Sequence, residues 1–223
     1  MKEKINELSM DLKTIESFSK GWSRHSEFLK LYPFRKNPIL IDKLTSERVF
    51  DPGKQSPEYF FYWIEHALKP LGHLGIGSSS TWENAKNNID KLKALLKIAV
   101  DESLAVSEKV DAPWGDIKGF GSDKHIAKKI IFCYYPKKVI PIFKTDHLEH
   151  FVRKIGFNYR LMAQEKYKKN YDALSTGQKF EFLNELLFNY KGQIDEFKKW
   201  DNALFSGFLY KTYPNVVKGF SGT

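Results

Sequence analysis

Apolar side chains recur every three to four positions along most of this chain, which is the spacing of one face of an α-helix. Residues 3–31 show the pattern first, interrupted near Gly21, and predict one or two amphipathic helices. Further helices are predicted over residues 56–68, 81–99, 160–171, 177–190 and 196–211, over the stretch that follows Gly121 and stops before Pro136, and from Thr145 to Gly156. Because the only extended piece is residues 139–143, the pattern predicts a mainly α-helical fold.

Local signals mark where some of these helices begin. Ser56-Pro57-Glu58 combines a capping hydroxyl, a proline suited to the first helical position and an acid near the positive end of the helix dipole. The run from Tyr59 to Trp63 is aromatic on all sides, which predicts a helix buried on several faces. Thr145 can cap the helix that stops at Gly156.

The chain has 223 residues, which fits one large domain or two small ones. It contains no internal repeat and no low-complexity segment. We therefore expect a single compact multi-helix domain over residues 1–223, which could divide into lobes 1–110 and 111–215 followed by a tail at 215–223.

Composition narrows the class of protein. Cys133 is the only cysteine, so no disulfide can form within the chain, and a reducing compartment is expected. No run approaches the roughly 18 apolar residues of a membrane span, and the first residues lack the apolar core of a secretory signal. These features predict a cytoplasmic protein without a membrane partner.

The net charge of +9 is confined to one segment. Residues 118–169 hold 13 basic and 4 acidic side chains, and the rest of the chain is balanced. Clustered lysine and arginine favour a polyanion such as nucleic acid, because they release counterions from a phosphate backbone. The alternative is a lysine-rich surface that is simply solvated.

The sequence lacks the motifs of nucleotide hydrolysis and of metal binding. The glycine loop at 72–81 has no lysine directly before its final hydroxyl residue, so it is not a P-loop, and we expect it to be a connector. His147 and His150 could share one helix face, but no third ligand has a suitable position. The sequence therefore predicts no metal, no cofactor and no nucleotide hydrolysis.

The segment Ile117-Lys118-Gly119-Phe120-Gly121 suits phosphate binding. Two glycines before a helix let successive backbone N–H groups point outward, where a phosphate can approach without meeting a side chain. The segment resembles the hairpin of helix-hairpin-helix DNA-binding proteins, which reads hydrophobic-x-Gly-hydrophobic-Gly. An ordinary helix-helix turn is the alternative. The DNA-contacting residues predicted from this hairpin, residues 117–129, and its surroundings are Lys118, Gly119, Gly121, Lys124, His125, Lys128 and Lys144.

The resemblance extends to helix-hairpin-helix DNA glycosylases, in which the hairpin, a helix and a short extended piece precede an aspartate at the start of the next helix. Residues 141–156 have this order, with Asp146 in the place of the catalytic carboxylate. Two features depart from that family. Ala127 lies six positions after Gly121 where the family has its small residue at four, and Asp123 occupies the place of the family's lysine nucleophile.

A broader resemblance covers most of the chain. The phrases at residues 23–34, 82–85, 119–136 and 205–214 look like the amino-terminal region of McrB-type AAA+ proteins of modification-dependent restriction systems. The resemblance implies a region that recognises DNA, often at a modified base. It also implies two partners, an AAA+ domain that hydrolyses GTP and a nuclease subunit.

Reading a base outside the duplex would require planar side chains that stack on it. Trp82, Trp114 and Phe120 are the candidates, and core packing is their alternative role. Taken together, the sequence predicts a non-enzymatic module that binds double-stranded DNA through its phosphates and reads a modified base. A glycosylase that uses Asp146 and a protein-interaction domain remain the alternatives.

Overall fold

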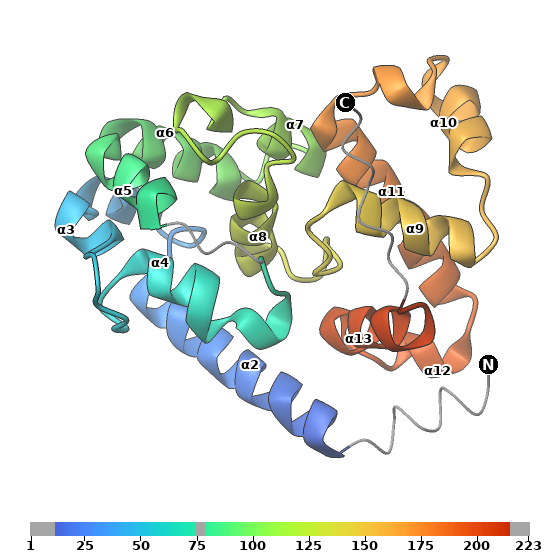
Figure 1. Cartoon of the computed structure of the whole chain (residues 1–223), viewed down its shortest axis with the longest axis horizontal. Helices are drawn as coiled ribbons and strands as arrows, with labels where there is room; N and C mark the ends of the chain where they lie inside the picture. The colour runs from blue at the N-terminus through green and yellow to red at the C-terminus, as the bar shows by residue number, and fades with distance from the viewer. Residues whose placement is uncertain (1–11, 75–78, 215–223) are drawn as a thin grey trace.

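The computed structural model describes residues 12–74 and 79–214, and this part of the chain is helical without a β-strand (Figure 1). The mainly α-helical fold is thus confirmed. The α-helices are α2 (Leu12–Leu31), α3 (Ser46–Val49), α4 (Phe60–Tyr62), α5 (Ser79–Asn87), α6 (Ile89–Val100), α7 (Val106–Asp111), α8 (His125–Tyr134), α9 (Thr145–Lys154), α10 (Tyr159–Tyr167), α11 (Thr176–Gly192), α12 (Asp195–Lys198) and α13 (Asn202–Thr212). Short stretches of tighter or wider helix are η1 (Pro38–Lys43), η2 (Trp63–Ala67), η3 (Lys69–Leu71), η4 (Trp114–Asp116) and η5 (Tyr171–Ala173). The predicted tail at 215–223 lies outside the described residues.

Helix α2 runs without a break through Gly21, where the sequence predicted an interruption. The glycine serves packing. A Cβ built at Gly21 would lie 2.9 Å from the Leu71 side chain and 3.1 Å from Pro70, so its absence lets α2 approach η3 closely.

The helix predicted at 56–68 begins later than its capping signal. Residues 56–59 form a turn, and α4 starts at Phe60 because the Trp63 indole donates a hydrogen bond of 2.8 Å to the Pro57 carbonyl and holds that segment outside the helix. Likewise the long helix predicted at 81–99 is two helices, α5 and α6, which break at Asn88.

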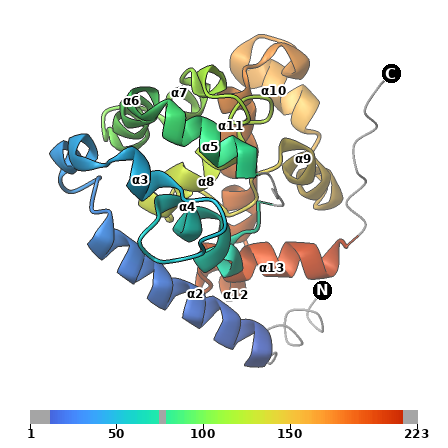
Figure 2. The same ribbon diagram turned by 60° about the vertical axis from the view of Figure 1, so that its left-hand side comes forward.

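The helices form two groups with α8 between them, α2 to α7 on one side and α9 to α13 on the other (Figures 1 and 2). Helix α8 packs on α6, α7 and η2, while α11 packs on both α7 and α9. One buried core runs through both groups. The lobe boundary expected at 110/111 falls within α7, which packs on α11 of the other group.

Helix α8 is the centre of the core and is buried from Ile126 to Tyr134. Even Lys129 is fully enclosed. Its ammonium donates hydrogen bonds to the carbonyls of Leu68 at 2.7 Å, Leu71 at 3.0 Å and Gly72 at 2.8 Å, and burial lowers its pKa to about 8. This contact fixes the segment around η3 on α8.

Among the described helices, none combines the length and the apolar character needed to cross a membrane.

Candidate nucleic-acid interface

The glycine turn lies between η4 and α8 and is anchored by Phe120. This ring is buried between two indoles, edge-on to Trp82 at 5.4 Å and stacked on Trp114 at 6.3 Å. The turn is also tied to α5, because the Asn84 side chain donates a hydrogen bond to the Lys118 carbonyl. Residues 117–124 are thus held rigidly at the surface of the core.

The backbone of this turn needs its first glycine. Gly119 has φ +96°, and a Cβ there would lie 2.5 Å from the Thr81 hydroxyl oxygen. Gly121 has an ordinary φ, and a Cβ added to it would only touch Gly115, at 3.4 Å. Neither glycine amide has a hydrogen-bond partner within residues 12–74 and 79–214. Both N–H groups are therefore available to an acceptor outside the described chain.

The structure does not form the compact two-helix hairpin that the motif suggested. Residues 112–124 separate α7 from α8 and contain the extra turn η4. Ser122 and Lys124 also adopt positive φ, 56° and 53°, just before α8 begins. The loop is longer than the motif predicts because the Trp114 indole is buried beneath it and donates a hydrogen bond to the Lys109 carbonyl.

Lys128 was predicted to contact DNA, and this prediction is wrong for the folded chain. Its side chain is 0% exposed, and its ammonium lies 2.7 Å from the Asp123 carboxylate and 2.9 Å from the Thr145 hydroxyl. Asp123 also accepts a hydrogen bond of 2.9 Å from the Thr145 amide, the first of α9. Lys128 and Asp123 therefore join the glycine turn to the start of α9 and neutralise each other.

The other predicted basic residues have different surroundings. Lys118 and Lys144 are exposed, the latter directly before α9. Lys124 is less free, since its ammonium lies 3.4 Å from the Ala112 carbonyl. His125 is half-buried at the start of α8, and burial lowers its pKa, an effect that the nearby Asp123 partly offsets. Lys118 is thus an exposed cation within the turn, and Lys144 is an exposed cation next to Thr145, whose amide binds Asp123.

The aromatic residues predicted to stack on a base are core residues. Trp82, Trp114 and Phe120 are at most 1% exposed, so none presents a ring to a ligand. The sequence placed these residues in or beside loops, but Trp82 lies in α5, Trp114 lies in η4, and the Phe120 ring points inward from the turn. The three rings pack together under the turn. Their alternative role, core packing, is the one observed.

Comparison of the chain with family models, curated protein sequences and solved structures gives no match. The site must be interpreted from its own geometry.

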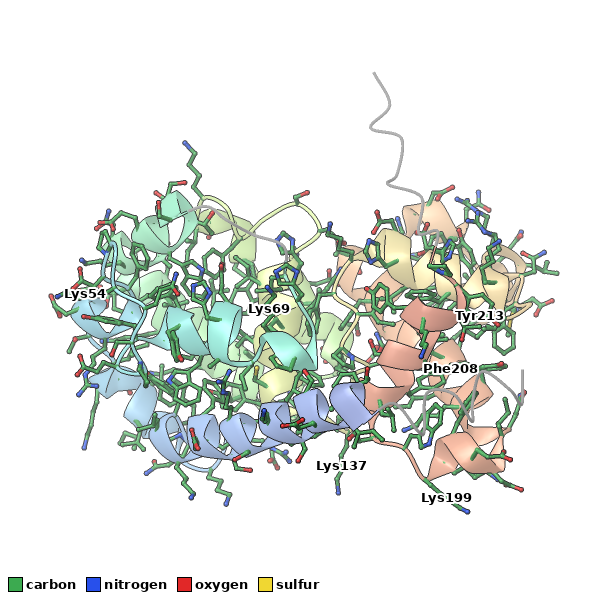
Figure 3. The ribbon with its side chains drawn as sticks, turned by 60° about the horizontal axis from the view of Figure 1, so that its bottom comes forward. Lys54, Lys69, Lys137, Lys199, Phe208 and Tyr213 are labelled. Carbon is green, nitrogen blue, oxygen red and sulfur yellow. The ribbon has the colours of Figure 1, made fainter. Side chains whose placement is uncertain are left out.

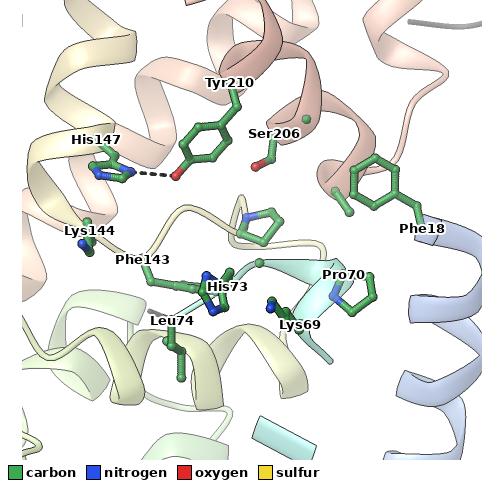
Figure 4. Close-up of a pocket in the computed structure, with 14 residues that line it drawn as sticks. Phe18, Lys69, Pro70, His73, Leu74, Phe143, Lys144, His147, Ser206 and Tyr210 are labelled. Carbon is green, nitrogen blue, oxygen red and sulfur yellow. Dashed lines mark hydrogen bonds between the residues drawn. The ribbon is translucent and has the colours of Figure 1, made fainter. Parts of the chain in front are cut away.

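A cavity of about 340 Å³ lies beside the turn, between the two groups of helices (Figure 4). Lys69 and His73 line the cavity from η3 and the segment after it, and Phe143 and Lys144 line it from the segment before α9. Residues of α9 and α13 complete it with His147, Ser206 and Tyr210. Lys144 lines the cavity, and its neighbour Thr145 binds Asp123 of the turn. The cavity and the turn are therefore neighbours.

The polar side chains in the cavity interact with one another. His147 Nδ1 and the Tyr210 hydroxyl are 2.8 Å apart. Burial raises the pKa of Tyr210, so the phenol keeps its proton near neutral pH. Burial and the charges of Lys69, Lys129 and Lys144 lower the pKa of His73. Burial likewise lowers the pKa of His147, and the negative charge of Asp146 partly offsets this lowering.

Asp146, the carboxylate of the glycosylase alternative, does not line this cavity. It is exposed in the first turn of α9, where it accepts a hydrogen bond of 2.8 Å from the His147 amide. A carboxylate in this position stabilises the start of the helix. In the described part of the chain, moreover, no three histidine, cysteine or acidic side chains come together as a metal site would require.

Sequence reasoning missed the residues that distant segments bring to this region. Lys91, on α6, places its ammonium 3.4 Å from the Asp116 carbonyl next to the turn. Lys69, His73 and Tyr210 reach the cavity from segments that lie far from α9 in the sequence. No local motif marks them, because their proximity depends on how η3 and α13 pack.

The basic segment is also more dispersed than the sequence suggested. Lys137 and Lys138 follow the opposite end of α8 from the turn, and Lys137 projects from the surface there (Figure 3). Arg160 pairs with Asp172, and Lys166 pairs with Glu185. Only part of the excess charge therefore surrounds the turn.

Proposed function

We propose that this chain binds double-stranded DNA by its phosphate backbone, through the turn at 117–124. The observation that carries the proposal is the pair of glycine amides at 119 and 121. They have no partner within the described chain, exposed Lys118 adjoins Gly119, and exposed Lys144 precedes Thr145, whose amide binds Asp123 of the turn. Backbone N–H groups in a glycine-containing turn are suited to a phosphate, and lysines add Coulombic attraction.

The charges around the turn support this choice of ligand. The one carboxylate within the turn, Asp123, is bound by the buried ammonium of Lys128 and the amide of Thr145, so it does not repel an anion. Helices α8 and α9 both begin near Asp123. The positive ends of their two dipoles add to the positive potential around the turn. Lys91 adds a further cation from α6.

The biological setting of the proposal comes from the sequence resemblance alone. A DNA-recognition module of the McrB type would act with an AAA+ domain that hydrolyses GTP and with a nuclease subunit. Contacts to phosphates position a protein on DNA but carry no base information. Because Trp82, Trp114 and Phe120 lie in the core, we do not assign base reading to the turn.

The proposal is tested by measuring the affinity for a 20-base-pair duplex over a range of salt concentrations. We expect Lys118→Gln/Lys144→Gln to weaken binding and to reduce the slope of log K against log salt by about 2, one for each lost phosphate contact. The matched control is Lys36→Gln/Lys199→Gln, which removes the same charge from exposed positions elsewhere and should leave the slope close to that of the unmodified protein.

Other outcomes would favour the alternatives. If the protein has no salt-dependent affinity for duplex DNA, a protein-interaction domain is the better account. If it releases bases from damaged or modified duplexes and Asp146→Asn abolishes the release, the chain is a glycosylase.

A further inference from the structure

The cavity between the helix groups has features that duplex binding at the turn does not use. Its polar lining consists of two ammonium groups, two imidazoles and two hydroxyls, contributed by Lys69, Lys144, His73, His147, Ser206 and Tyr210. No carboxylate is among its described lining residues. Asp146, outside the lining, has an oxygen 3.9 Å from His147 Nε2. A cavity of this composition is complementary to an anion.

The positive potential inside the cavity acts on its own side chains. The pKa of His73 is lowered by burial and by three separate lysines, Lys69, Lys129 and Lys144. Lys129 lies behind the wall, where the carbonyls of residues 68–72 bind its ammonium. An anion placed among these groups would relieve their mutual repulsion.

The rest of the lining is apolar and suits a larger ligand than a free ion. Phe143 and Leu74 form part of the wall, and Phe18 closes the end next to α13 (Figure 4). A volume of about 340 Å³ is within the range of small-molecule sites. An anionic group joined to a planar or apolar body therefore matches the cavity better than inorganic phosphate does.

The cavity walls are preformed. The backbone of Gly72 packs closely on Phe143. A Cβ added at Gly72 would lie 2.6 Å from the Phe143 ring and 2.9 Å from the Pro141 carbonyl oxygen. Phe18 likewise packs over Gly207, where a Cβ would be 2.9 Å away. A site held in this way can bind without first ordering its side chains.

We propose that this cavity binds a phosphorylated nucleotide, with its phosphate between Lys69 and Lys144 and its sugar and base against Phe143 and Leu74. The ligand is either the phosphorylated end of a DNA strand or a free nucleotide, which share this chemistry. The choice of a nucleotide among anionic planar ligands rests on the proposed DNA-binding function. The cavity itself is a second site, distinct from the turn.

Titration calorimetry with thymidine 5′-monophosphate, thymidine and inorganic phosphate tests the proposal. We expect the nucleotide to bind at least on the order of tenfold more tightly than either fragment, because only it offers both the charge and the apolar body. Lys69→Gln and His73→Gln should each reduce its affinity several-fold, while the distant Lys36→Gln should not. Equal affinities for thymidine and its monophosphate, or nucleotide binding insensitive to Lys69→Gln, would overturn the proposal.

Duplexes with 5′-phosphate or 5′-hydroxyl ends identify the source. A preference for phosphorylated ends that Lys69→Gln removes assigns the cavity to strand ends, and nucleotide binding without that preference assigns it to free nucleotides. Lys118→Gln separates the two proposals, since it should weaken duplex binding and leave binding of the monophosphate unchanged. If duplexes bind with the expected salt dependence but no phosphorylated probe binds better than its unphosphorylated counterpart, the cavity proposal alone fails.

Discussion

The two glycines of the turn are present for different physical reasons. Gly119 has a positive φ and touches Thr81, so it is required for the fold of the turn. Gly121 has neither constraint, and its Cβ would meet only Gly115. The sequence shows the same residue type at both positions, and only the structure shows that the backbone of the turn requires glycine at 119 but not at 121.

This difference predicts unequal effects of substitution. We expect Gly119→Ala to lower the free energy of unfolding by about 1–3 kcal/mol, because it combines a strained φ with a steric clash. Gly121→Ala should change it by less than about 1 kcal/mol. Chemical denaturation of both variants measures the difference. Equal stability of the two variants would show that the turn does not have the described conformation.

At the level of elements, the link between the turn and α9 depends on a buried pair. Lys128 is fully enclosed and binds Asp123 and Thr145. We expect Lys128→Met to destabilise the protein by about 1–3 kcal/mol, since it removes the ammonium from a carboxylate that is one-third exposed and still accepts hydrogen bonds from Thr145. Adding Asp123→Asn should recover part of the loss, which denaturation of the single and double variants would reveal. A single variant as stable as the original protein would exclude the pair as a structural link.

The sequence predicted the elements better than their ends. Helical spacing located α8, α9 and α11 closely, while α10 ends four residues before its predicted end. It failed at residues 56–59, where the Trp63 indole binds the Pro57 carbonyl, six residues before it, and overrides a strong capping signal. For the site, the glycine motif gave the turn, but the burial of Lys128 and Trp82 depends on tertiary packing that no local pattern encodes.

On the scale of the whole molecule, the protonation of histidines is coupled to folding. The folded structure lowers the pKa of all six histidines from the ordinary value of 6.5, chiefly by burial. The unfolded chain therefore binds more protons than the folded chain as the pH falls below about 6.5. The contribution of the histidines to the free energy of unfolding should be complete above about pH 6.5. It should decrease as the pH falls from there to the lowered pKa values of the folded protein.

Thermal unfolding between pH 7.5 and pH 5 tests this coupling, since most carboxylates stay ionised over this range. We expect the midpoint to fall over this range, and His25→Gln to reduce the fall. In the folded protein His25 is buried, with Nε2 2.6 Å from the Cys133 carbonyl oxygen. A midpoint that is constant from pH 7.5 to pH 5 would contradict the lowered pKa values of the histidines in the folded protein.

Labelling with ¹⁵N-glycine gives the clearest test of whether the amides of Gly119 and Gly121 bind DNA phosphate. Each glycine amide gives a separate resonance that can be followed while a duplex is added. We predict that the Gly119 and Gly121 resonances shift downfield with the same apparent affinity as the duplex binds, while those of Gly156 and Gly192, which lie on other helices' ends, stay unchanged. Saturation of the protein with duplex while the Gly119 and Gly121 resonances remain in place would contradict the account.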